Sequence, residues 1–120
     1  MTPQLQRRLE QLLERHHEVG LLLAEPEAAN DAKRFRDLSR EYAQTQELAD
    51  AFGASRRADE ELAHAREMLA DPDMRDLARE EIARLESAHA ELEARLWRSY
   101  TDYLAATGQL ERWAGLEGTP

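Results

Sequence analysis

The chain has 120 residues and no cysteine, which excludes disulfides. Its formal net charge of −9 argues against free nucleic acid, including free DNA, as the primary partner, because phosphate binding needs surplus Lys and Arg, but it does not exclude docking on a ribosome through one basic patch. Ala, Leu, Glu and Arg dominate and β-branched residues are scarce, a composition typical of long helices and not of sheets. The longest apolar run, Leu21–Ala24, is too short to span a membrane, and Met1–Gln4 do not resemble a signal peptide, so we expect a cytoplasmic protein.

The first predicted helix covers residues 3–24. Thr2 is a favourable N-cap, Pro3 suits the first helical position, and Pro26 disfavours helical geometry in the residue before it. Apolar positions then alternate in steps of four and three, the spacing of a coiled-coil seam. They are Leu5, Leu9, Leu12, His16, Val19 and Leu23.

The second predicted helix covers residues 31–70, with Asn30 or Asp31 as its cap. Its first half carries a regular seam, after which the register breaks at Gly53–Ser55 and resumes at Leu62. We interpret this as a kink or stutter within one helix, with two separate helices as the alternative. The seam consists of Phe35, Leu38, Tyr42, Thr45, Ala49 and Phe52.

The third predicted helix covers residues 72–107, with Asp71 as its cap, Pro72 at its first position and Gly108 as its left-handed C-terminal cap. The short junction predicts that the second and third helices form an antiparallel hairpin. We therefore expect an all-α, three-helix fold with a long coiled-coil-like hairpin, onto which the first helix packs its leucine stripe. Residues 1–107 form the expected domain, and 108–120 form a tail.

Histidines and acidic residues of the chain do not group into a convincing metal site. His16 and His17 project about 100° apart on a helix, so they cannot face one ion. We interpret His16 as a seam residue and His17 as a surface residue, and we expect His64 and His89 to stand alone. Glu86–His89 matches the Glu-x-x-His motif of di-iron bundles once, whereas such a site needs it twice. We expect no metal, no cofactor and no catalytic residue.

Two other groups of side chains are candidates for binding a partner. Lys33, Arg34, Arg36 and Arg40 form a basic stretch that is either a docking patch or ordinary helix surface. The aromatic residues Trp97, Tyr100, Tyr103 and Trp113 either anchor the tail or form a partner-binding face, since Trp and Tyr are favoured interface anchors.

Three segments, Arg8–Leu23, Arg34–Gln44 and Ala65–Ala78, resemble the N-terminal helical domain of bacterial peptide chain release factor 1 in order and spacing. The most distinctive parts are Phe-Arg-x-Leu-Ser-Arg-Glu-Tyr-Ala, from Phe35, and Leu-x-Asp-Pro-x-Met-Arg, from Leu69. The similarity extends from about Leu5 to Leu96, after which the sequence departs from the family.

This resemblance implies a three-helix domain that docks on the ribosome near the GTPase-associated centre and the stalk-base protein. The family's Gly-Gly-Gln loop, which positions water at peptidyl-tRNA, and its stop-codon-reading Pro-x-Thr tripeptide do not occur in this sequence. Thr107–Gln109 only echoes the former, because it lacks the first glycine.

The leading hypothesis is therefore a ribosome-binding module of translation termination that is not itself an enzyme. Its expected contact residues are the basic stretch and the predicted hairpin tip, which includes Asp71, Met74 and Arg75. The alternative is a coiled-coil homodimerising scaffold or adaptor without a ribosome link, favoured by the regular seam on the second and third predicted helices. We expect a monomer or a weak homodimer that does not bind membranes.

Overall fold

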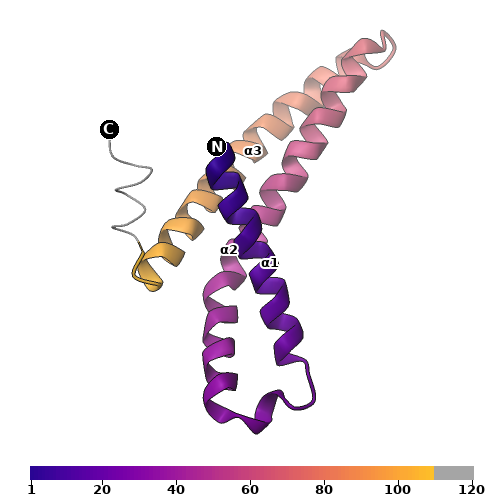
Figure 1. The fold of residues 1–120 in the computed structure, drawn as a ribbon. Coiled ribbons are helices and arrows are strands. Elements are labelled where there is room, and N and C mark those ends of the chain that lie inside the picture. Colours follow the sequence, from indigo (N-terminus) through magenta and orange to yellow (C-terminus); the bar gives the residue numbers. More distant parts are fainter. Residues whose placement is uncertain (110–120) are drawn as a thin grey trace. The chain divides into compact units, whose positions relative to one another are not determined.

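The computed structural model describes residues 1–109, and every regular element in that range is helical. The three α-helices are α1 (Pro3–Leu23), α2 (Ala32–Glu67) and α3 (Arg75–Ala106), as Figure 1 shows. Short 3₁₀ segments lie at Ala28–Asn30 and Met68–Ala70. The predicted all-α, three-helix fold is thus confirmed. Among residues 1–109, no helix combines the length and apolar character that crossing a membrane requires.

The beginnings of α1 and α2 follow the predicted caps. Thr2 Oγ1 accepts a hydrogen bond from the backbone N–H of Leu5 at 3.1 Å, and Pro3 occupies the first turn. Asp31 Oδ1 accepts from the N–H of Arg34 at 3.1 Å. Each cap satisfies a backbone donor that has no partner within its own helix, so short polar side chains determine where both helices begin.

The end of α3 is the predicted left-handed cap. Gly108 has a φ of 72°, a conformation that glycine adopts without steric cost. Its N–H donates to the carbonyl of Ala105 at 3.3 Å, and the N–H of Gln109 donates to that of Leu104 at 2.7 Å. This pair of bonds is a Schellman motif. Thr107–Gln109 therefore closes a helix.

The beginning of α3 differs from the prediction by three residues. Asp71 does not cap a helix starting at Pro72; its Oδ1 accepts from the N–H of Asp73 at 3.0 Å, and its carbonyl accepts from the N–H of Met74 at 3.0 Å. These bonds close a turn over residues 72–74, and the helix starts only at Arg75. The Asp71 side chain thus accepts a backbone hydrogen bond within a turn. An aspartate side chain can accept such a bond in a turn as well as at the start of a helix.

The helices contribute to two units, and the first consists of Met1–Asp50 together with residues 101–109. Within it, α1 runs antiparallel to the first half of α2 (Figure 1). The predicted stripe of α1 is buried except for Leu23, which is half-buried. The buried residues of this unit are Leu5, Leu9, Leu12, His16, Val19, Ala28, Leu38, Thr45, Leu48 and Leu104.

The second unit, Ala51–Tyr100, is a hairpin of the second half of α2 and most of α3 (Figure 1). Leu62, Ala65 and Leu85 form a buried cluster against which Ile82 packs. The apparent break at Gly53–Ser55 is not a break, because α2 continues through it and both Ser55 and Ala58 are buried. Small side chains extend the seam where no large apolar residue marks it in the sequence.

Candidate functional site

Two charged side chains connect α1 and α2 beside the predicted basic stretch. Arg15 donates two hydrogen bonds to Glu41, from Nε to Oε1 at 2.7 Å and from a terminal nitrogen to Oε2 at 3.0 Å. Arg15 also forms an ion pair with Glu18, with 3.3 Å between Nη1 and Oε1. The hydrogen bonds to Glu41 raise the pKa of Arg15 above its usual value. Glu41 is therefore engaged by a residue 26 positions earlier in the chain.

An open hollow of about 310 Å³ lies next to this pair, within the first unit. Its floor is the buried Leu38, and its walls carry charges of both signs. The other lining residues are Arg15, Asp31, Lys33, Arg34, Asp37 and Glu41. Because three cations face three carboxylates, the hollow itself is not a strong site for an anion.

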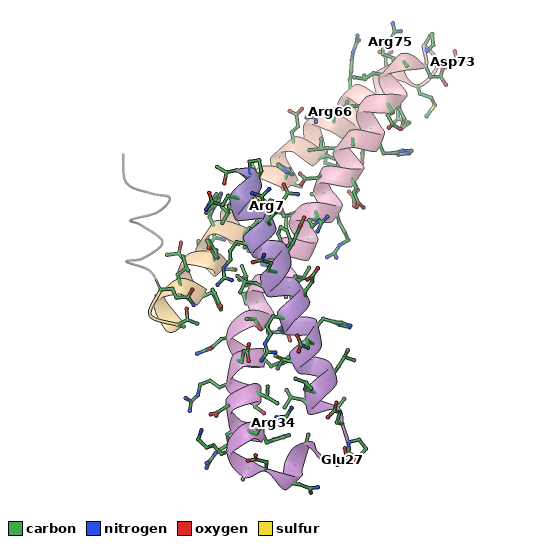
Figure 2. All side chains as sticks on the ribbon, viewed as in Figure 1. Arg7, Glu27, Arg34, Arg66, Asp73 and Arg75 are labelled. Carbon is green, nitrogen blue, oxygen red and sulfur yellow. The ribbon has the colours of Figure 1, made fainter. Side chains whose placement is uncertain are left out.

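All four residues of the basic stretch lie together on the first turns of α2 and are exposed. Lys33 pairs with Asp37 at 3.5 Å. Arg34, Arg36 and Arg40 form no ion pair with any residue of the described range 1–109. Figure 2 shows Arg34 at the start of α2, near the connection that contains Glu27. The structure thus presents unneutralised guanidinium groups at this position.

The other predicted contact residues lie in the second unit, at the turn between α2 and α3. Asp71 and Arg75 are exposed and Met74 is half-buried; Figure 2 shows Arg75 and Asp73 at this turn. Arg75 Nε donates to the carbonyl of Leu69 at 3.2 Å, which holds its side chain across the turn. The seven predicted residues therefore form two groups, one in each unit.

His16 is a structural residue of the first unit. Its Nδ1 lies 2.6 Å from Thr45 Oγ1, and its ring stacks on Tyr42 with a centroid separation of 4.2 Å. Burial lowers the pKa of His16, which favours the neutral ring at neutral pH. His17 is exposed, as predicted.

His89 was expected to stand alone, but its Nε2 lies 2.5 Å from Asp59 Oδ1. The two residues are 30 positions apart, and only the hairpin brings them together. Glu86, the acidic member of the Glu-x-x-His match, pairs with Arg66 at 3.5 Å instead. Within residues 1–109, no three His, Asp or Glu side chains gather as metal ligands.

The aromatic residues are placed in different surroundings. In the second unit, Tyr100 is buried and Trp97 is 37% exposed. In the first unit, Tyr103 is half-buried. Trp113 lies outside the described residues, as does the tail from residue 110 onward.

A comparison with protein families gives one informative result. Residues 12–105 match the model of the PCRF domain. This match covers most of the chain and includes the basic stretch, the turn at Asp71 and the His16 contacts. No solved structure matches the chain.

Proposed function

The chain belongs to the PCRF domain family, and we propose from that membership that it is a ribosome-binding module acting in translation termination. The domain is the non-catalytic helical part of release factors. The single observation that carries the proposal is the family match over residues 12–105. The narrower proposal of a relative of peptide chain release factor 1 is supported only by the resemblance of three segments of the sequence to that factor.

In this proposal, residues 1–107 are the binding domain and 108–120 are an appended tail. The chain docks in the cytoplasm near the GTPase-associated centre and the stalk-base protein, and it does not hydrolyse peptidyl-tRNA. Its contacts come from Lys33, Arg34, Arg36 and Arg40, and from Asp71, Met74 and Arg75. The exposure of six of these seven residues supports their assignment.

Co-sedimentation with 70S ribosomes tests this function. The chain should pellet with ribosomes at low salt and saturate at one copy per ribosome. Bovine serum albumin, which is also acidic, is a suitable control, because it shows how much protein is trapped in the pellet without binding ribosomes. A chain that stays entirely in the supernatant would contradict the proposal.

A competition assay tests the link to termination. Ribosomes carrying peptidyl-tRNA at a stop codon release the peptide when full-length release factor 1 is added. An excess of this chain should slow that release if both proteins occupy the same docking region, and the chain alone should release nothing. An unchanged rate at saturating chain would place its binding elsewhere on the ribosome.

A further inference from the structure

The basic stretch of α2 contains a stripe of three cations on one helical face. With about 100° between successive residues, Lys33, Arg36 and Arg40 project within roughly 60° of one another. Arg34 and Lys33 both line the neighbouring hollow, whereas Arg36 and Arg40 do not. We call Lys33, Arg36 and Arg40 the cationic stripe. Four cations within eight residues are a strong local concentration for a chain with a net charge of −9.

The carboxylates nearest to the stripe are already occupied. Asp37 lies 3.5 Å from Lys33, and Glu41 accepts both hydrogen bonds of Arg15. Asp31 uses Oδ1 to cap the helix. The guanidinium groups of Arg36 and Arg40 consequently have no ion-pair partner among residues 1–109.

This arrangement costs the isolated chain free energy. The stripe begins in the first turn of α2, where the helix dipole favours anions and disfavours cations. Arg36 and Arg40 are also four residues apart, a spacing at which like charges destabilise a helix. Sequences that break such local rules usually gain something in function. A bound anion would offset both costs.

We propose that Arg36 and Arg40 bind two backbone phosphates of one RNA strand, with Lys33 and Arg34 beside them adding positive charge at the rim of the hollow. Guanidinium groups bind phosphate through two parallel hydrogen bonds. The helical rise between Arg36 and Arg40 is about 6 Å, so each can take a separate phosphate of one strand. The proposal rests on the proposed function, and it names the RNA of the ribosome, rather than a ribosomal protein, as the part that this surface contacts.

The overall charge of the chain sharpens this assignment. A net charge of −9 repels nucleic acid at long range. Salt screens this repulsion beyond about 10 Å, so the stripe can attract phosphates only through direct contacts. Binding should therefore require RNA that is folded into a fitting shape, as ribosomal RNA is. An acidic protein surface is the competing partner, and binding to purified ribosomal RNA, which contains no protein, separates the two.

The test compares two triple variants of the full chain that carry the same change in charge. R34Q/R36Q/R40Q removes three cations at the stretch, and R57Q/R79Q/R98Q removes three exposed cations of the second unit. Arginine and glutamine have similar helix propensities, and circular dichroism confirms that both variants fold. Affinity for 70S ribosomes is measured by co-sedimentation over a series of KCl concentrations.

The stretch variant should bind at least tenfold more weakly than the control variant. The slope of log K against log salt should also fall by about one for each phosphate that the variant no longer binds, hence by two to three. Equal affinity and slope in the two variants would overturn the inference while leaving the proposed function intact. Weaker ribosome binding by the stretch variant, together with equal binding of the two variants to purified ribosomal RNA, would also overturn it and would indicate an acidic protein partner.

A second measurement keeps the inference testable if the wild-type chain does not bind ribosomes at all. Fluorescence anisotropy then follows binding to purified ribosomal RNA at low salt. Weaker RNA binding by the stretch variant than by the control variant would support the stripe even though the proposed function had failed. Indistinguishable binding by the two variants would overturn it.

Discussion

Thr45 is a polar residue in an otherwise apolar seam, and its role follows from its hydrogen bonds. Its hydroxyl donates to the carbonyl of Glu41 at 3.0 Å or that of Tyr42 at 3.2 Å. The oxygen is then available to accept from His16 Nδ1, 2.6 Å away. The contact thus joins α1 to α2 through a buried donor and a buried acceptor.

Thr45→Val should therefore destabilise the chain even though valine has nearly the same shape. The variant leaves His16 Nδ1 buried without a partner, and the free energy of unfolding should fall by about 1–3 kcal/mol. Urea denaturation followed by circular dichroism measures the change. The double variant with His16→Leu should recover part of the stability, because both partners are then apolar; a decrease below about 0.5 kcal/mol for Thr45→Val would show that water replaces the hydroxyl.

His16 should also make stability depend on pH. Burial, the largest cause, lowers its pKa, with a further lowering by His17 and an opposing effect of Asp50. The folded state therefore binds this proton less readily than the unfolded state. The resulting stability is fully present above the ordinary histidine pKa, about 6.5, and it is lost as pH falls below that value until the folded pKa is reached.

Urea midpoints measured from about pH 8 to about pH 5, which spans the histidine range, test this dependence. His16→Gln should flatten the fall in stability below about pH 6.5 relative to the unchanged chain. His17→Gln is the matched control, because His17 is exposed and adjacent, and it should retain the fall. Identical profiles for the two variants would contradict the role assigned to burial.

At the scale of helices, the two glycines of α1 and α2 should respond differently to alanine. A Cβ at Gly53 would meet only Arg57, at an ordinary 3.5 Å, and no positive φ is required there. Gly53→Ala should therefore stabilise α2 by about 0.5–1 kcal/mol. A Cβ at Gly20 would lie 3.1 Å from the Tyr42 ring, which stacks on His16.

Gly20→Ala should consequently fail to stabilise the chain, because the gain in helix propensity is offset by displacement of Tyr42. Thermal unfolding of both variants measures the contrast, and Gly53→Ala should raise the midpoint by a few degrees. A lower midpoint for Gly53→Ala would contradict this prediction. It would indicate that α2 bends at Gly53 in a way that an alanine side chain does not allow.

Helix ends were predictable from the sequence where a residue is suited to one capping position and to few other local structures. Pro3, Asp31 and Gly108 each leave few alternatives, and the observed ends agree within one residue. The start of α3 was not predictable in this way, because Asp71 can close a turn as well as cap a helix. The seam through Ser55 was not predictable either, because small buried residues have no apolar signature.

The candidate site was only partly predictable for a similar reason. The basic residues of α2 are evident in the sequence, but the availability of neighbouring carboxylates depends on contacts between distant segments. Glu41 has no cation three or four residues away on α2, and only the fold shows that Arg15 pairs with it. The pairing of His89 with Asp59 likewise depends on a hairpin, so the sequence pattern did not predict it.

At the scale of the whole molecule, the structure argues against the alternative hypothesis that the chain is a homodimeric coiled-coil scaffold. A homodimeric seam needs a continuous apolar stripe that is left open in the single chain. Here apolar seam residues of α2 and α3 are already buried within one chain, with Leu38, Leu62 and Leu85 each no more than 7% exposed. The large apolar side chains that are exposed within residues 1–109 are scattered over several elements. They are Met1, Leu21, Phe35, Leu77 and Trp97.

We therefore expect sedimentation equilibrium at neutral pH to report a single species of 13.8 kDa up to high protein concentration. The net charge of −9 adds repulsion between copies, so the measurement should be repeated at high salt, where that repulsion is screened. A dimer that appears only at high salt would reveal a weak apolar contact, and Leu21→Asp, at the most exposed of these side chains, tests whether α1 provides it. A stable dimer at both salt concentrations would favour the scaffold over the ribosome-binding module, because the second copy would then compete for the surfaces assigned to the ribosome.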